Sequence, residues 1–304
     1  MSAKKFDFTV IGNAGIDTNI YLFGNEIDFS VEANFTENID YIGQAGGYTS
    51  RGFAQLGYAT AFIGYVGNDY NGRYIKQEFS RDGINTDAMF TDPAGTSRSI
   101  NFMYPDGRRK NFYDGKSHMT LEPDLVKCTG ILSKSKFVHF HIPNWARKLL
   151  PLAKDLDLTI SCDIQDIVSI DDPYRQDFIN YSDIIFFSAA NHGSPEPIMR
   201  SILKIYPDKI IISGLGDRGC ALCANGNIEY FEAVQLDEPV IDTNGAGDGL
   251  AVGFLSSYLF EKNYLSESIL RGQICARFTC SRKADTSSLI TKKQLETYFN
   301  KMTT

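Results

Sequence analysis

The chain has 304 residues, a hydrophobic content of 43%, a charged content of 22% and a formal net charge of −7. This length allows a full hydrophobic core, and one large domain with a small appendage is favoured over two equal domains. The acidic balance argues against nucleic acid or an anionic membrane as the main partner. Because the N-terminal run lacks a signal-peptide pattern and no apolar stretch reaches about 18 residues, the expected location is the cytoplasm.

Strands and helices alternate along most of the chain. Buried strands are expected at residues 6–12, 59–66, 137–142, 158–163, 184–187 and 209–213, and helices at 72–79, 267–282 and 292–299. Alternation of this kind predicts a mainly parallel sheet with helices on both faces.

Two segments depart from this alternation. Residues 18–44 alternate polar and apolar side chains weakly and contain no convincing helix. Residues 97–113 contain a β-hairpin pattern with a Pro-Asp-Gly turn at residues 105–107. The two segments indicate either a small β subdomain, such as a lid, or a plain surface hairpin.

A glycine pair opens the first helical pattern. Residues 46–57 read GGYTSRGFAQLG, which predicts a tight turn at Gly46 and Gly47, then a helix, then a glycine stop. Asp17 follows the first strand. In an open α/β sheet, functional groups lie past the carboxyl ends of strands, so Asp17 is either a functional acid or an ordinary turn residue.

Residues 242–248 read DTNGAGD and precede an apolar run with helical spacing. Small residues at Gly245, Ala246 and Gly247 would let the backbone approach a ligand, and the helix start would aim free N–H groups at an anion. Asp248 then fits a general base that accepts a proton from a hydroxyl as a phosphoryl group is transferred. The alternative is an aspartate that only caps the helix.

Two further patterns are rejected on their context. Residues 214–219 spell GLGDRG, but the next stretch predicts two strands rather than the helix that a dinucleotide site needs. His139 and His141 lie on one face of a strand. Because the sequence places no third ligand near them, packed or hydrogen-bonded histidines are favoured over a metal site.

With Asp17, the glycine pair, the β excursion and the DTNGAGD stretch, nearly the whole chain resembles the ribokinase (PfkB-type) carbohydrate kinase family. The resemblance implies a three-layer αβα fold with a mainly parallel central sheet. Residues 1–304 would form a single kinase domain, with lid segments at about 18–44 and 97–113. The implied reaction is transfer of a phosphoryl group from ATP to a sugar hydroxyl, with Asp248 as base and the glycine-lined helix start as anion hole.

The same resemblance implies that Asp17, Gly46 and Gly47 bind substrate hydroxyls under the lid. Arg51 stands where many members carry asparagine. A guanidinium group favours a carboxylate or phosphate partner, which leads to the hypothesis that the substrate carries an anionic group and contacts Arg51. The alternative is that Arg51 forms an ion pair with Asp17 or another internal acid.

The resemblance also implies cofactors. Mg²⁺ is expected on the phosphates of ATP, and in some members a monovalent cation such as K⁺ lies beside the residue equivalent to Asp242. The N-x-x-E pattern of the family, which is tied to the metal and phosphates, falls on residues 188–191, where the glutamate is replaced by asparagine. The residues expected near the nucleotide are Ser188, Asn191, Gly214, Gly216 and Asn244.

Two other functions remain open from the sequence. A nucleoside kinase of the same fold would need an aromatic wall, which Tyr21, Phe23, Tyr48 and Phe102 could supply, although packing is the commoner role of such residues. A non-catalytic family member that only binds a ligand is the third hypothesis, motivated by the missing glutamate. Members of the family often dimerise through the lid, so a homodimer is also expected.

Overall fold

The central sheet is built from short runs of β-branched and aromatic residues that are covered on both faces. The computed structural model describes residues 4–167, 169–190 and 193–303. Strand β4 (Thr60–Gly67) is buried at every position, as expected for a parallel strand between two helical layers. Within the described residues, the sheet has nine strands in the order β13-β12-β11-β10-β9-β8-β1-β4-β5.

The strands from β5 to β11 in this order pair in parallel, and β12 and β13 are added as an antiparallel edge. The remaining strands of the sheet are β1 (Phe6–Ile11), β5 (Asn85–Asp92), β8 (Ser135–Phe140), β9 (Thr159–Asp166), β10 (Ile184–Ser188), β11 (Ile210–Gly214), β12 (Cys220–Ala224) and β13 (Asn227–Phe231).

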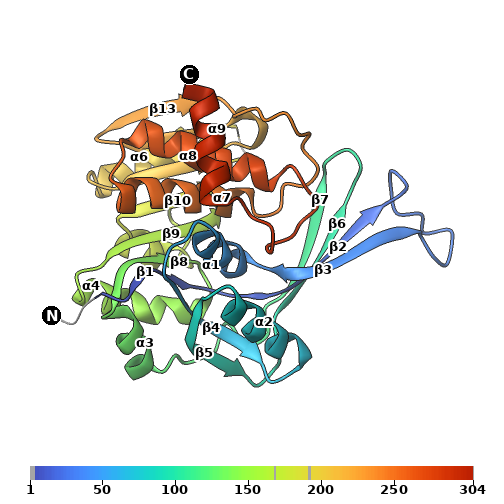
Figure 1. Ribbon diagram of the computed structural model, residues 1–304, viewed down its shortest axis with the longest axis horizontal. Helices are drawn as coiled ribbons and strands as arrows, with labels where there is room; N and C mark the ends of the chain where they lie inside the picture. Colours follow the sequence, from blue (N-terminus) through green and yellow to red (C-terminus); the bar gives the residue numbers. More distant parts are fainter. Residues whose placement is uncertain (1–3, 168, 191–192, 304) are drawn as a thin grey trace.

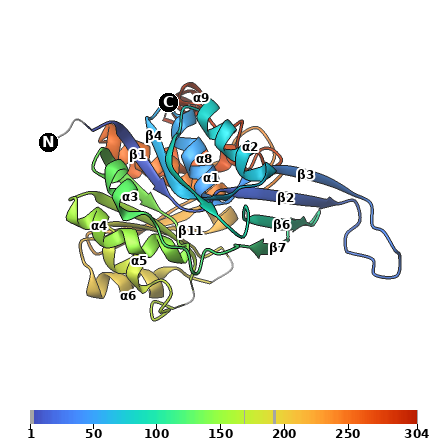
Figure 2. The same cartoon turned by 90° about the horizontal axis from the view of Figure 1, so that it is seen from below.

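Helices cover both faces of this sheet, as Figures 1 and 2 show. On one face lie α1 (Ala45–Gln55), α2 (Tyr70–Arg81), α7 (Ala246–Leu255), α8 (Leu265–Thr279) and α9 (Lys292–Thr303). On the other lie α3 (Leu125–Leu132), α4 (Leu150–Asp155), α5 (Gln176–Tyr181) and α6 (Glu196–Ile205). Short 3₁₀ turns η1 (Asn144–Leu149) and η2 (Gly216–Arg218) and a π-helical turn η3 (Ser256–Glu261) complete the chain.

Each helical layer encloses its own hydrophobic core. One core gathers around Trp145 and Phe178, and the other around Phe8, Phe53 and Phe254. This arrangement is the predicted three-layer αβα fold. Among the described residues, no helix combines the length and the apolar character needed to cross a membrane.

A second sheet of four strands stands out from the main body as a lid (Figure 1). Its order is β3-β2-β6-β7, with β2 (Gly15–Leu22), β3 (Thr36–Gly43), β6 (Arg98–Met103) and β7 (Arg109–Asp114). Strands β6 and β7 form the expected hairpin, and Gly107 at its turn has a φ of 87°. The β excursion is therefore a separate small sheet, rather than a plain surface hairpin.

Two local predictions were wrong. Gly46 and Gly47 do not form a turn before the helix, because α1 already begins at Ala45 and both glycines lie in its first turn. The alternative of an ordinary turn residue at Asp17 was also wrong, since the chain enters β2 at Gly15 and Asp17 lies in the lid sheet.

Candidate active site

The corner predicted at residues 242–248 forms as a loop that leads into α7. The helix begins at Ala246, and Asp248 lies in its first turn. Gly245 precedes the helix with a φ of 75°, and a Cβ atom there would lie 2.2 Å from Cε1 of Tyr48. Glycine is therefore required at this position both by backbone conformation and by space. Gly247 is open, since a Cβ there would meet no atom within 4 Å.

The N–H groups in the first turn of a helix have no intrahelical partner, so they are free to donate hydrogen bonds to an anion. The backbone N–H of Ala246 donates a long hydrogen bond to the carbonyl oxygen of Thr243, at 3.3 Å. The helix dipole adds partial positive charge at the same point. An anion approaching residues 245–247 would therefore meet donors on the backbone and open space at Gly247.

Asp242 anchors this loop to the lid. Its Oδ1 accepts hydrogen bonds from the backbone N–H and the Nδ2 of Asn244, each at 2.8 Å. Its Oδ2 accepts from Nδ2 of Asn19 at 2.9 Å and from the hydroxyl of Tyr21 at 2.6 Å. Oδ2 also accepts a longer hydrogen bond from the backbone N–H of Ala284 at 3.3 Å, so five donors surround the four lone-pair sites of the carboxylate. The donor set does not fit a cation ligand, so we assign Asp242 a structural role.

Asp17 lies buried in β2, with 7% of its surface exposed. Its Oδ2 accepts a hydrogen bond from the backbone N–H of Gln44 at 3.0 Å and a longer one from the hydroxyl of Tyr41 at 3.4 Å. Among the described residues, its Oδ1 has no hydrogen-bond partner. Burial raises the pKa of this carboxyl to about 6. A buried acceptor without a donor fits a hydroxyl group supplied by a ligand.

The glycine pair in α1 serves close packing. The N–H of Gly46 donates to the carbonyl oxygen of Asn13 at 3.0 Å, and a Cβ on Gly46 would lie 2.5 Å from that oxygen. Gly47 is less confined, with Ile42 as its nearest neighbour at 3.5 Å. The first helical turn therefore lies directly against the connection between β1 and β2.

Arg51, one turn further along α1, is held by internal partners. Its Nε donates to Oδ2 of Asp82 at 2.6 Å, and its Nη1 donates to Oγ1 of Thr286 at 2.9 Å. The side chain is only 6% exposed. The contact supports the alternative of an internal ion pair, with Asp82 rather than Asp17 as the acid.

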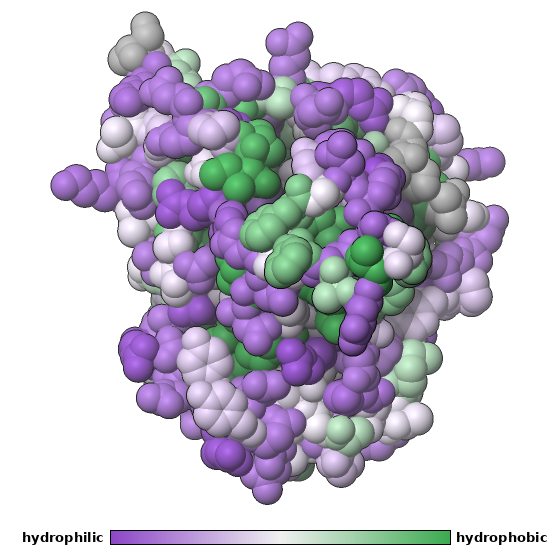
Figure 3. Space-filling model, turned by 90° about the vertical axis from the view of Figure 1, so that its right-hand side faces the viewer, coloured by the Kyte–Doolittle hydropathy of each residue, from purple (hydrophilic) through white to green (hydrophobic). Residues whose placement is uncertain are grey.

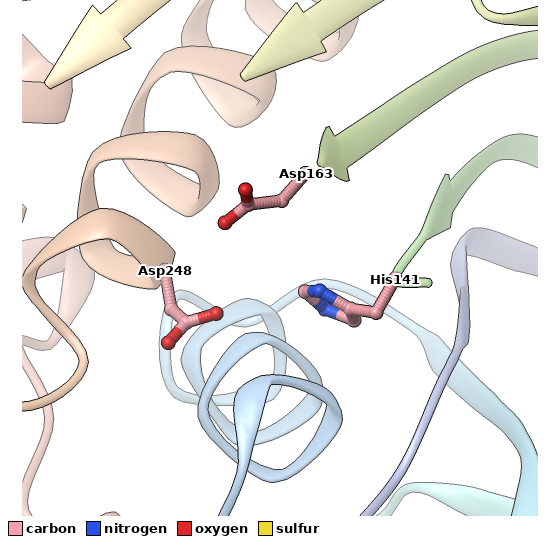
Figure 4. Close-up of side chains that lie close together, drawn as sticks. All are labelled: His141, Asp163 and Asp248. Carbon is pink, nitrogen blue, oxygen red and sulfur yellow. The ribbon is translucent and has the colours of Figure 1, made fainter. Parts of the chain in front are cut away.

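Two residues that sequence reasoning did not assign to the site lie next to Asp248. Figure 4 shows the side chains of His141, Asp163 and Asp248 pointing toward one another. One ligand atom of each lies within 4.8 Å of the others. His141 directly follows β8, and Asp163 is the last residue of β9 that pairs with β10 before an irregularity. The expectation that no third ligand lies near His141 was therefore wrong.

The electrostatics of this cluster favour the neutral forms of its members. Burial first, then the charges of Asp163 and Asp17, raise the pKa of Asp248 well above its usual range. Burial also raises the pKa of Asp163 to about 6. The pKa of His141 is held well below its ordinary value, mainly because its ring is desolvated. Asp248 is consequently a stronger base than an exposed aspartate.

The residues expected at the nucleotide lie at the carboxyl ends of neighbouring strands. Ser188 ends β10, Gly214 ends β11, and the two residues pair in register. Gly216 follows in a turn with a φ of 66°. Asn191 lies outside the described residues. The prediction that residues 214–219 are not a dinucleotide-binding motif is confirmed, because η2 and strand β12 follow β11 instead of a long helix.

The lid reaches this corner through a residue that the sequence did not single out. Arg109, the first residue of β7, donates a hydrogen bond from Nη1 to Oδ1 of Asn244. Arg109 also lowers the pKa of Asp17 and of Asp248 by its charge, against the larger effect of burial. The lid thus brings the guanidinium group of Arg109 close to both Asp17 and Asp248.

The sequence was compared with protein families and with known proteins. Residues 17–292 match the pfkB family carbohydrate kinases. The acarbose 7(IV)-phosphotransferase of Actinoplanes sp. is 27% identical over 96% of this chain and 98% of its own length. A 5-dehydro-2-deoxygluconokinase of Listeria monocytogenes is 24% identical, with coverage of 97% and 96%.

Solved structures show the same fold. A microbiome-derived acarbose kinase superimposes with a TM-score of 0.87 at 24% identity, covering 97% of this chain and 99% of that one. The ribokinase of Arabidopsis thaliana, solved with ribose and ATP, superimposes with a TM-score of 0.80 at 19% identity and covers 97% and 98%. The family match spans most of the chain, and the fold and the lid agree with it. The chain therefore belongs to the pfkB family of carbohydrate kinases, which are phosphotransferases with an alcohol group as acceptor.

Proposed function

We propose that this enzyme transfers a phosphoryl group from ATP to a hydroxyl group of a sugar or sugar-like substrate, with Asp248 as the general base. The observation that carries the proposal is the position of Asp248 in the first turn of α7, directly after the Gly245–Gly247 backbone. A carboxylate beside an anion-binding helix start can take a proton from the acceptor hydroxyl while N–H groups stabilise charge on the phosphoryl group.

The proposed substrate contacts are supported by one buried acceptor. Oδ1 of Asp17 has no partner among the described residues, and a sugar hydroxyl would supply the missing donor. The backbone at Gly46 and Gly47 would border the same sugar. Arg51 is not proposed as a substrate ligand, because Asp82 and Thr286 already hold its guanidinium group.

ATP is proposed to lie along the carboxyl ends of β10 and β11, near Ser188, Gly214, Gly216 and Asn244. Its triphosphate would end at the N–H groups of Gly245–Gly247. Ser188 is a poor direct ligand for Mg²⁺, because its side chain offers only a neutral hydroxyl. Mg²⁺ is expected to arrive on the phosphates, which it screens.

Two relatives suggest where to search for the substrate. One is named for acarbose and the other for 5-dehydro-2-deoxygluconate. A nucleoside substrate is less well supported: the Tyr21 hydroxyl donates to Asp242, the Tyr48 ring packs in a small core beside Tyr41, and Phe23 is largely exposed. The proposal therefore favours a sugar, and the sugar class is left to the assay.

A homodimer through the lid and a cytoplasmic location complete the proposal. The lid sheet and its connecting loop expose large hydrophobic residues, including Phe35, Ile100 and Phe112. Figure 3, which views the molecule from the right-hand side of Figure 1, shows hydrophobic residues gathered within a polar surround.

All six cysteines are free and buried, which suits a reducing compartment that also supplies ATP.

A coupled assay of ADP release tests the function. The panel contains monosaccharides, acarbose, 5-dehydro-2-deoxygluconate and nucleosides, each with and without ATP. Turnover of a sugar or sugar-like compound is the expected result. Turnover of nucleosides alone would replace the proposal with a nucleoside kinase. Binding of a sugar with no ADP release, in the wild-type protein, would identify a non-catalytic member.

A further inference from the structure

The cluster of His141, Asp163 and Asp248 contains hydrogen-bond acceptors that lack donors. Among the described residues, Oδ1 of Asp248 and Nδ1 of His141 are buried and have no hydrogen-bond partner. His141 is 2% exposed, so solvent does not supply the missing contact freely. Oδ1 of Asp163 accepts the backbone N–H of Gln165 at 2.7 Å, and no such N–H reaches the other two atoms.

The neighbour of His141 determines which ring nitrogen carries the proton. Nε2 of His141 lies 3.0 Å from Oγ1 of Thr49. The single hydroxyl proton of Thr49 is donated to the carbonyl oxygen of Ala45 at 2.8 Å. Oγ1 must therefore accept from Nε2–H of His141, since a hydroxyl has only one proton to donate. The other nitrogen, Nδ1, is left with a bare lone pair.

A ring nitrogen with a free lone pair, next to two carboxyl groups, is a typical set of metal ligands. We propose that His141, Asp163 and Asp248 form a binding site for a divalent transition-metal ion, with Zn²⁺ as the expected occupant. Zn²⁺ accepts three protein ligands of nitrogen and oxygen type and keeps a fourth position for water. The imidazole favours it over Mg²⁺, which prefers oxygen ligands alone.

The surroundings of the three ligands support this assignment. Metal-binding histidines usually donate their other N–H to a fixed acceptor, and Thr49 is that acceptor here. His141 directly follows β8, Asp163 lies in β9 and Asp248 lies in α7, so regular elements fix the backbone at or next to each ligand (Figure 4). Ligand atoms within 4.8 Å of one another need only small side-chain rotations to reach the about 2.1 Å bond lengths of Zn²⁺.

The proposed ion would also affect catalysis. Zn²⁺ bound to the Asp248 carboxylate would compete with the proton that this group is proposed to accept, so Zn²⁺ should inhibit the kinase. This consequence rests on the proposed function, whereas the binding site itself does not. Binding measured without sugar or nucleotide therefore tests the site independently of whether Asp248 is the base.

Isothermal titration calorimetry with ZnCl₂ tests the site on the full-length protein after chelator treatment. The wild type should bind Zn²⁺ at one site. His141→Gln and Asp163→Asn should each weaken binding more than about tenfold, because each removes one ligand. His118→Ala is the matched control, since His118 lies outside the cluster, and it should bind as the wild type does.

Thermal unfolding without Zn²⁺ establishes that each variant is folded. The two ligand variants change different segments, one directly after β8 and one within β9, so one of them remains informative if the other does not fold. The proposal is overturned if the wild type shows no stoichiometric binding, or if a folded Asp163→Asn protein binds Zn²⁺ as tightly as the wild type.

Discussion

Arg109 of the lid strand β7 is hydrogen-bonded to Asn244 in the loop that leads into α7. This contact joins the lid to the corner that carries Asp248, across 135 residues of sequence. It places a guanidinium group near both acids of the site, where it can offset their negative charge.

Replacing this arginine should therefore weaken catalysis more than folding. Arg109→Ala is expected to lower kcat/KM by about tenfold, the loss that corresponds to one charge-assisted hydrogen bond. The control is Arg108→Ala, because the contacts of Arg108 among the described residues are with Asp106, Glu26 and the Tyr104 ring, and its side chain is more than half exposed. Steady-state kinetics of both variants provide the measurement. Equal losses in the two variants would argue against a role for the Arg109 contact.

The ion pair between Arg51 and Asp82 should contribute to stability and not to substrate binding. Arg51→Asn leaves Asp82 without its cation, and we expect a loss of free energy of unfolding on the order of 3 kcal/mol. The double variant Arg51→Asn/Asp82→Asn should recover part of it. Urea unfolding measures both. A raised KM for the best substrate, with stability unchanged, would instead restore the hypothesis of an anionic substrate group at Arg51.

Replacement of Gly245 and of Gly247, at the start of α7, should change the stability of the fold in opposite directions. Gly245→Ala should destabilise the fold by at least about 1 kcal/mol, because its φ is positive and the new Cβ would meet the Tyr48 ring. Gly247→Ala should stabilise it by about 0.5 kcal/mol, since the new Cβ meets open space within a helix. Thermal unfolding distinguishes the two. A stable Gly245→Ala protein would mean that the loop is not held as described.

The buried carboxylate of Asp17 should lower the free energy of unfolding at neutral pH. Its folded-state pKa of about 6 exceeds the ordinary value of 3.8, so the unfolded chain loses this proton at lower pH than the folded protein. The cost therefore grows between about pH 4 and pH 6 and is constant above that range. Asp17→Asn should raise the free energy of unfolding at pH 7 by up to about 3 kcal/mol, and by little at pH 4.

The same substitution should lower kcat/KM, because the asparagine replaces the carboxylate that is proposed to bind a sugar hydroxyl. Urea unfolding of the wild type and of Asp17→Asn at pH 4 and pH 7 measures the stability, and steady-state kinetics at pH 7 measure kcat/KM. Loss of stability at pH 7, or a gain that is the same at both pH values, would show that Asp17 is not a strained buried acid.

The sequence predicted what local patterns can encode. The helix start at residues 245–248 follows from glycines and an acid within four positions, and the β6–β7 hairpin follows from its turn residues. The parallel sheet follows from alternating strands and helices, because few other arrangements bury both. These features depend on neighbours in the chain.

The remaining features depend on pairings between distant segments. His141 and Asp163 approach each other because β8 and β9 are adjacent in the sheet, and α7, which carries Asp248, packs against the neighbouring strand β10. No local pattern gives these pairings. The one usable signal was their position at the carboxyl ends of parallel strands. The partner of Arg51 was missed for the same reason, since Asp82 is 31 residues away on the far end of another helix.

The proposed mechanism depends on one step, in which the carboxylate of Asp248 accepts the proton of the substrate hydroxyl. The most direct measurement is kcat for Asp248→Asn with the best sugar and saturating ATP, beside Asp237→Asn, an exposed acid outside the site. The kcat of Asp248→Asn should fall by roughly 10²- to 10⁴-fold with little change in KM, and the control should keep the wild-type rate. A folded Asp248→Asn enzyme that keeps a kcat within about threefold of the wild type would exclude Asp248 as the general base.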